Sequence, residues 1–98
     1  MGIEFEGRAT SPLSRSTIAA VFTAVALDQT WAIVRREQHE LGLRPKEEPG
    51  DETIVVEIDG ATIFVLFHVA TRPQCEAFLA LLQTALAAQR VKCDFKEL

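Results

Sequence analysis

The chain has 98 residues, a formal net charge of -4 at pH 7, 48% hydrophobic and 24% charged residues, and two cysteines. The apolar fraction is too high for a disordered tail, and two cysteines are too few for a disulfide-dense secreted module. The negative charge argues against a nucleic-acid binder, because such affinity depends on basic residues that neutralise phosphates. We therefore expect a single domain over residues 1–98 that binds no nucleic acid.

No segment has the pattern of a secretory signal or a membrane span. The chain begins with alternating apolar and acidic residues, whereas a signal peptide has a basic start and an apolar core. The longest apolar stretch, residues 18–27, has only about half the length that a spanning helix needs. We therefore expect a cytoplasmic protein without membrane contact, in which Cys75 and Cys93 stay free thiols.

Residues 3–8 alternate apolar and charged side chains, which predicts a short half-buried strand. Ser11 and Pro12 follow, and they favour the start of a helix: serine caps its first turn, and proline fits its first position.

An apolar stripe at helical spacing continues from there. It consists of Ala20, Ala24, Leu27, Trp31, Val34 and Leu41. We expect helix over residues 12–41, ended by Gly42, with Trp31 in the core. Two alternatives remain open: Asp28 caps a second helix, or residues 30–36 form a strand. Residues 42–53, rich in proline, glycine and acids, predict a mobile loop.

The clearest local pattern is a β-hairpin. Residues 53–58 and 61–69 are rich in β-branched side chains, and the Asp-Gly pair at 59–60 is typical of a type I′ turn between two strands. A two-residue turn at that pair places Ile58 opposite Ala61.

The C-terminal third predicts a helix and a strand. The helix begins near residue 72, either with a capping box of Thr71 and Gln74 or with Pro73 in its first position. Its buried face consists of Phe78, Leu81, Leu82, Ala85 and Leu86. Alternating side chains over residues 91–96 then predict a half-buried strand.

The order strand, helix, strand, strand, helix, strand predicts an α+β fold, the ferredoxin-like βαββαβ two-layer sandwich. Its antiparallel sheet has the order 4-1-3-2 and carries two helices on one face, the first of them long or kinked. Many unrelated functions use this topology, so it says little about chemistry.

The open face of such a sheet carries an unusual apolar patch. Alternation places Val55, Phe64, Leu66 and His68 on the side away from the helices. An apolar patch with a charged rim marks a surface for a partner or a ligand. The alternative is that the chain covers this face itself, with the end of the long helical segment or with the 42–53 loop.

Few residues are candidates for catalysis or metal binding. Cys75 in the first turn of the last helix and His68 before it could form a nucleophile and base, but no third group orients them. A buried small residue and a sheet histidine are the simpler interpretation. The sequence has no CxxC, HxH or HExxH pattern, so we expect no catalytic residue, no metal and no cofactor.

These observations favour a small non-enzymatic binding or assembly module that acts through the apolar sheet face. Small open-faced sheets often pair as symmetric dimers, so we expect a homodimer, or another protein as partner. A small-molecule-sensing regulatory domain with the 42–53 loop as a lid is the alternative. An enzyme that uses Cys75 and His68 is the third hypothesis.

Overall fold

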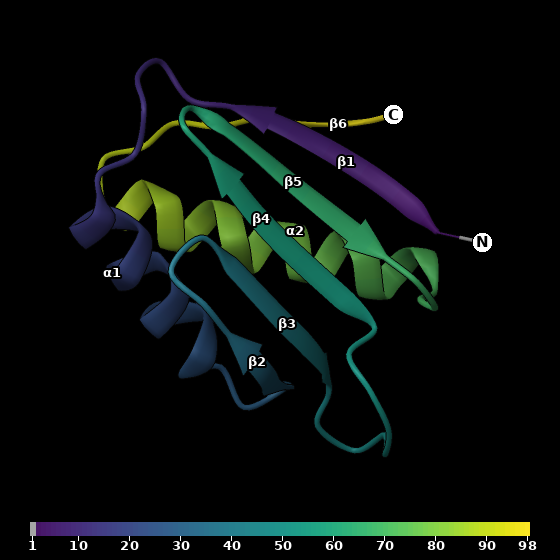
Figure 1. The fold of residues 1–98 in the computed structure, drawn as a ribbon. Helices are drawn as coiled ribbons and strands as arrows, with labels where there is room; N and C mark the ends of the chain where they lie inside the picture. Colours follow the sequence, from purple (N-terminus) through teal and green to yellow (C-terminus); the bar gives the residue numbers. More distant parts are fainter. Residues whose placement is uncertain (1) are drawn as a thin grey trace.

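The computed structural model describes residues 2–98, which form one six-stranded sheet and two helices. Figure 1 shows both helices on the same face of the sheet. The elements in chain order are β1 (Ile3–Arg8), α1 (Arg15–Ala26), β2 (Trp31–Arg36), β3 (Glu40–Pro45), β4 (Ile54–Asp59), β5 (Thr62–Phe67), α2 (Arg72–Ala88) and β6 (Phe95–Glu97).

The strands lie in the order β2-β3-β4-β5-β1-β6, and all neighbours are antiparallel. Helix α1 crosses behind the sheet from β1 to the far edge at β2, and α2 crosses from β5 to β6 (Figure 1). The ferredoxin-like prediction is therefore wrong. Strands β2 and β3 extend the sheet beyond β4, where the sequence pattern had predicted the second half of a long helix.

Helix α1 is short. The Oγ atom of Ser14 caps it by accepting the backbone N–H of Thr17 at 3.2 Å, so the predicted cap at Ser11 is wrong by one turn. The helix ends at Ala26, and Leu27 is 77% exposed although it belongs to the predicted stripe.

A local turn separates α1 from β2. The Oδ1 atom of Asp28 accepts the backbone N–H of Thr30 at 2.9 Å, and this bond offers the backbone an alternative to helix. The β-branched residues that follow favour the extended backbone of a strand. The continuous helix and the second helix capped by Asp28 are both wrong, whereas the alternative of a strand over residues 30–36 is confirmed by β2.

Strand β3 includes the glycine that had been expected to end a helix. Gly42 lies in the strand between Leu41 and Leu43, which are both fully buried. Residues 42–45 therefore belong to the sheet, and the predicted 42–53 loop is shorter than expected. The helix predicted from the apolar stripe was wrong because Trp31 and Leu41 fit both a helical spacing and the core-facing positions of two paired strands.

The β4–β5 hairpin is confirmed, with a shifted turn. Asp59 pairs with Thr62 and Ile58 with Ile63, so the two turn residues are Gly60 and Ala61. Only Gly60 has a positive φ, which fits a turn with glycine first and does not fit type I′. The predicted partners are therefore wrong by two residues, but a shift of two leaves every side chain on its predicted face.

Helix α2 begins with the predicted capping box. The Thr71 side chain accepts the N–H of Gln74, and the Gln74 side chain accepts the N–H of Thr71 at 2.9 Å. Strand β6 is shorter than the predicted 91–96 segment, and it is attached to α2 by an ion pair of 2.8 Å between Arg72 and Glu97.

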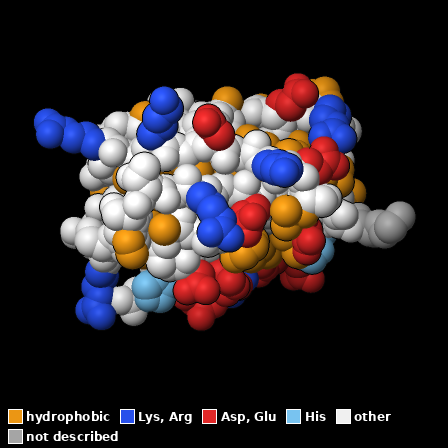
Figure 2. Space-filling model, turned by 90° about the horizontal axis from the view of Figure 1, so that it is seen from above, with side chains coloured by type: hydrophobic (Ala, Val, Ile, Leu, Met, Phe, Trp, Pro, Cys, Tyr) orange, Lys and Arg blue, Asp and Glu red, His pale blue; other side chains and the backbone are white. Residues whose placement is uncertain are grey.

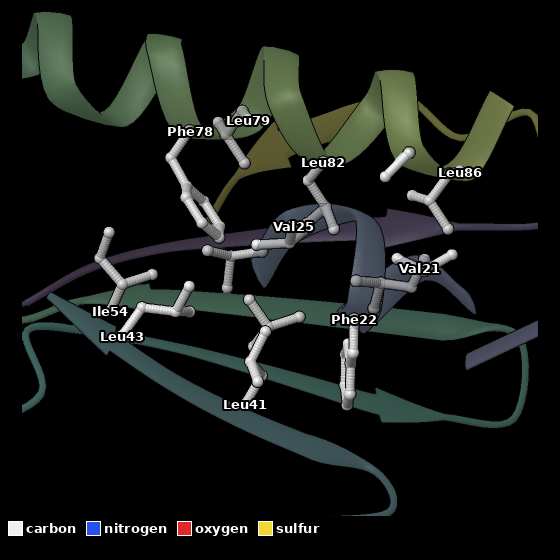
Figure 3. Packing of buried hydrophobic residues seen from close by; sticks show 14 of the residues in the cluster. Val21, Phe22, Val25, Leu41, Leu43, Ile54, Phe78, Leu79, Leu82 and Leu86 are labelled. Carbon is white, nitrogen blue, oxygen red and sulfur yellow. The ribbon is translucent and has the colours of Figure 1, made fainter. Parts of the chain in front are cut away.

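The core lies between the two helices and one face of the sheet (Figure 3). Trp31 is in it, as predicted, with its ring edge-on to Phe78 at a centroid distance of 5.3 Å. Full burial of one large apolar side chain contributes roughly 1.5–3 kcal/mol, so this layer is the main stabilising element. Its members include Val21, Phe22, Val25, Leu41, Leu43, Ile54, Phe78, Leu82 and Leu86.

Candidate functional site

The sheet face away from the helices carries an apolar strip over its central strands. Val55 of β4 lies opposite Leu66 of β5, and Phe64 is two residues from Leu66 on the same face. We call Val55, Phe64 and Leu66 the central strip. All three are half-buried, and neither helix packs over them (Figure 1).

Two rows of residues run across this face, perpendicular to the strands. The first row consists of Arg35, Gly42, Val55, Leu66 and Glu4. The second row consists of Glu40, Glu57, Phe64, Glu6 and Lys96. The central strip therefore has carboxylates on both sides.

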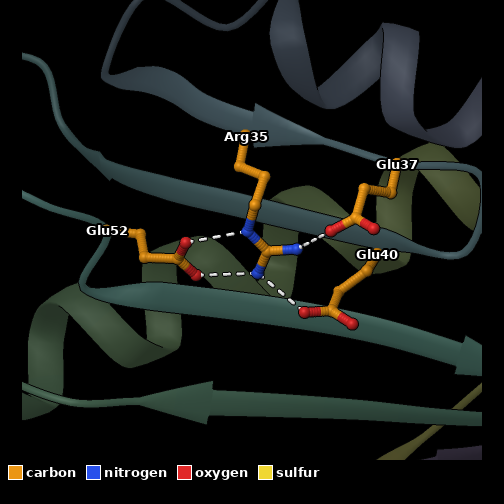
Figure 4. A network of polar contacts seen from close by, with 4 residues as sticks. All are labelled: Arg35, Glu37, Glu40 and Glu52. Atoms are coloured by element: carbon orange, nitrogen blue, oxygen red, sulfur yellow. Dashed lines mark hydrogen bonds and ion pairs between the residues drawn. The ribbon is translucent and has the colours of Figure 1, made fainter.

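On the β2–β3 side, Arg35 forms an ionic cluster with three glutamates (Figure 4). Its guanidinium donates to both carboxylate oxygens of Glu52, at 2.9 Å each. It also contacts Glu40 at 2.7 Å and Glu37. The bidentate geometry fixes the Glu52 side chain, because two parallel hydrogen bonds define its orientation.

Gly42 makes this arrangement possible. A Cβ atom at position 42 would lie 2.8 Å from the Glu52 carboxylate, so only glycine lets that side chain lie flat on the strand. Of the predicted 42–53 loop, Glu52 lies over β3 beside Gly42, whereas Val55, Phe64 and Leu66 stay half-buried. Residues 31–36 and 40–45 do not cover the face, because they are strands of the same sheet.

The cluster shifts the pKa values of Arg35 and Glu52. Hydrogen bonds from Arg35 hold the pKa of Glu52 below its usual range, and the positive charge of Arg35 adds to this effect. The carboxylates, Glu52 first, raise the pKa of Arg35 in turn. One arginine still leaves the cluster with an excess of negative charge.

A like-charged pair lies beside the cluster. Glu40 and Glu57 are direct cross-strand partners, an arrangement that is destabilising on its own. Arg35 neutralises Glu40, whereas no ion pair within residues 2–98 involves Glu57, which is exposed. The other flank of the strip carries Glu4 and Glu6 on β1.

Acidic side chains are consequently in excess on the β3–β4 side of the strip. Figure 2 looks onto the edge formed by β1 and β6, and it shows acidic side chains gathered along the lower margin, which is the open side of the sheet. Lys96 of β6 lies opposite Glu6, and Arg8 follows Glu4 and Glu6 on the same face of β1, so this edge also carries basic side chains. We call Glu40, Glu52, Glu57, Glu4 and Glu6 the acidic flanks.

His68 lies at the end of the strip, just beyond β5. Its backbone N–H donates to the carbonyl oxygen of Thr53 at 2.8 Å, and its side chain is exposed. Cys75, in the first turn of α2, is fully buried in the core. The sheet therefore separates the exposed histidine on the open face from the thiol on the helical side, and a nucleophile–base pair is not assembled.

Burial also works against an activated thiolate. It raises the pKa of Cys75 and of Cys93, whereas a nucleophilic cysteine needs a lowered pKa. Within residues 2–98 no group of three or more histidine, cysteine or acidic residues is placed to hold a metal ion. No helix of that described part is long and apolar enough to cross a membrane.

The remaining surface offers shallow polar hollows. One lies between the turn before β2, the loop after β3 and the start of α2, and it is lined by polar residues such as Gln29, Lys46 and Gln74. A ligand pocket is usually concave and mostly apolar, with a few convergent polar groups. This hollow is lined by polar and charged residues together with Pro45, so its lining is not mostly apolar.

Alternation predicted the central strip and His68, but the acidic flank on β3 was not predicted. Because a helix was expected over residues 12–41, Arg35, Glu37 and Glu40 were not expected on the sheet. The available sequence signal was Glu52 at the end of the acidic loop, together with Gly42. These two residues can be connected only once residues 31–45 are known to be strands.

No protein-family model matches the chain, and neither a curated protein nor a solved structure was found to match it.

Proposed function

We propose that the protein is a non-enzymatic binding module whose partner docks on the open sheet face over Val55, Phe64 and Leu66. The observation that carries the proposal is the apolar strip itself. Three large or branched apolar side chains are left half-buried at the centre of a sheet, where full burial of each contributes roughly 1.5–3 kcal/mol. A partner that covers them gains the remaining part of this stabilisation, because each side chain is still partly exposed to water.

The proposal includes the cytoplasmic location expected from the sequence. Both cysteines are free thiols, and a reducing compartment preserves them in that state. The homodimer expected from the sequence stays a prediction, and the molar mass of the purified protein in solution tests it.

The test begins with peptides selected from a random library on the immobilised protein. Their affinity is then measured for the wild type, for Val55→Lys and for Leu27→Lys. Val55→Lys places a charge in the central strip, so we expect binding to fall at least about tenfold, which is a loss of roughly 1.4 kcal/mol.

Leu27→Lys is the matched control. It makes the same kind of change at a side chain that is 77% exposed at the end of α1, on the helical side of the sheet. It should leave the affinity unchanged. If the selected peptides bind Val55→Lys as tightly as the wild type while both proteins are folded, the open face is not the binding surface.

A further inference from the structure

The acidic flanks define what kind of partner fits the central strip. Carboxylates lie on both sides of it: Glu40, Glu52 and Glu57 towards β3, and Glu4 and Glu6 on β1. An acidic partner would bring like charges together at short range, and burial of unpaired carboxylates is costly.

A second copy of the chain fits this face poorly. In a symmetric face-to-face dimer the same patch contacts itself, so the acidic flanks of one copy would meet the acidic flanks of the other. Arg35 cannot compensate, because Glu52, Glu40 and Glu37 already occupy its guanidinium. Arg8 and Lys96 lie near Glu6 at the β1–β6 edge, away from the excess of carboxylates on β3 and β4.

The pair of Glu40 and Glu57 also favours a basic partner. These two residues are direct cross-strand partners on β3 and β4, and Arg35 forms an ion pair with Glu40 only. Repulsion within the free protein is relieved when a cation is placed beside Glu57. The position next to Phe64, its partner on β5, therefore suits a lysine or arginine whose neighbours are apolar.

We infer that the occupant of the open face is a basic amphipathic polypeptide segment. Its apolar side chains cover Val55, Phe64 and Leu66, and its lysine or arginine side chains pair with the acidic flanks. This inference rests on the proposed function, because it specifies the partner of the same surface. Electrostatic attraction of this kind also accelerates association. High salt screens the attraction and so weakens binding.

Two synthetic amphipathic peptides test the inference. Both carry leucine at the same positions, and the remaining positions are lysine in one peptide and glutamate in the other. We expect the leucine–lysine peptide to bind the wild type at least about tenfold more tightly than the leucine–glutamate peptide. Its affinity should fall as the salt concentration rises.

Glu57→Gln separates the partner effect from a structural one. Removing one of two facing carboxylates should raise the melting temperature of the free protein, and it should weaken the leucine–lysine peptide about threefold or more. The control Glu76→Gln makes the same change of net charge on an exposed residue of α2, and it should leave the affinity unchanged. Leu66→Ser, or Phe64→Ser if the first variant unfolds, should weaken binding without a change of charge.

The outcomes separate the two proposals. Equal binding of both peptides, with a loss in Leu66→Ser, overturns the basic partner and retains the apolar docking face. Equal weakening by Glu57→Gln and Glu76→Gln also overturns the basic partner, because the attraction would then be a property of the whole molecule. A dimer in solution that Leu66→Ser dissociates assigns the face to a second copy and overturns the inference. Binding that neither Leu66→Ser nor Phe64→Ser changes contradicts both proposals.

Discussion

At the scale of single residues, Arg35 organises one half of the open face. It binds both oxygens of Glu52 and also contacts Glu40 and Glu37, with its own side chain one-third exposed. Exposed pairs of this kind typically contribute 0.2–1 kcal/mol, so the cluster fixes geometry more than it stabilises the fold. Gly42 belongs to the same cluster, because Glu52 occupies the space that a side chain at position 42 would fill.

The cluster predicts a specific dependence of stability on pH. The pKa of Glu52 is lower in the folded chain than in the unfolded one, so the pair with Arg35 stabilises the fold above the usual glutamate pKa of roughly 4.3. The contribution is lost as the pH falls through the lowered pKa. Glu52→Gln should therefore reduce the free energy of unfolding at pH 7 by up to about 1 kcal/mol and have little effect near pH 2.

Urea denaturation of the wild type and Glu52→Gln at pH 7, pH 4 and pH 2 measures this difference. Glu76→Gln on α2 serves as the control for net charge. A gap between wild type and Glu52→Gln that is the same at all three pH values would show that the ionised pair is not its cause.

At the scale of elements, the capping box of α2 could be predicted from the sequence as one of two possible helix starts, because all of its interactions are local. Thr71 and Gln74 are three residues apart, and the structure shows both hydrogen bonds of the capping box. Thr71→Ala removes the acceptor for the N–H of Gln74 and should lower the free energy of unfolding by about 1 kcal/mol.

Thermal unfolding followed by circular dichroism checks this value. Thr71→Ser keeps the hydroxyl group and should retain most of the stability. Equal losses in Thr71→Ala and Thr71→Ser would mean that the methyl group of Thr71, and not its oxygen, stabilises this end of the helix.

Residues 28–45 show where sequence reasoning failed and why. Their apolar residues fit a helical stripe, and they also fit two paired strands, since Trp31 and Leu41 occupy core positions in the sheet. The choice depends on a pairing with β4 that is distant in sequence, and on the turn at Asp28. The hairpin faces could be predicted because alternation decides them, whereas the exact turn residues could not, because Asp59 and Gly60 both favour turns.

The same limit applies to the candidate site. Val55, Phe64 and Leu66 were predicted as one face from alternation alone. The acidic flank at Glu40 and Glu52 requires the β3–β4 register and the position of Gly42, and neither follows from local pattern. The residues from which we infer a basic partner could therefore be recognised only with the fold.

At the scale of the whole molecule, the two faces of the sheet have different roles. One face is covered by α1 and α2 and forms the core, while the other presents an apolar strip between carboxylates (Figures 1 and 2). This division places the proposed binding surface on strands, away from the helices. It also means that substitutions on the open face can change binding without disturbing the main hydrophobic layer.

The most direct test of this account is a map of backbone amide shifts in the ¹⁵N-labelled protein during titration with the leucine–lysine peptide. We predict that the largest changes occur on β4, β5 and β1 around Val55, Phe64 and Leu66, and that the exposed sides of α1 and α2 change little. The largest changes on the two helices, with the central strip unaffected, would contradict the proposal that the open sheet face is where this protein binds.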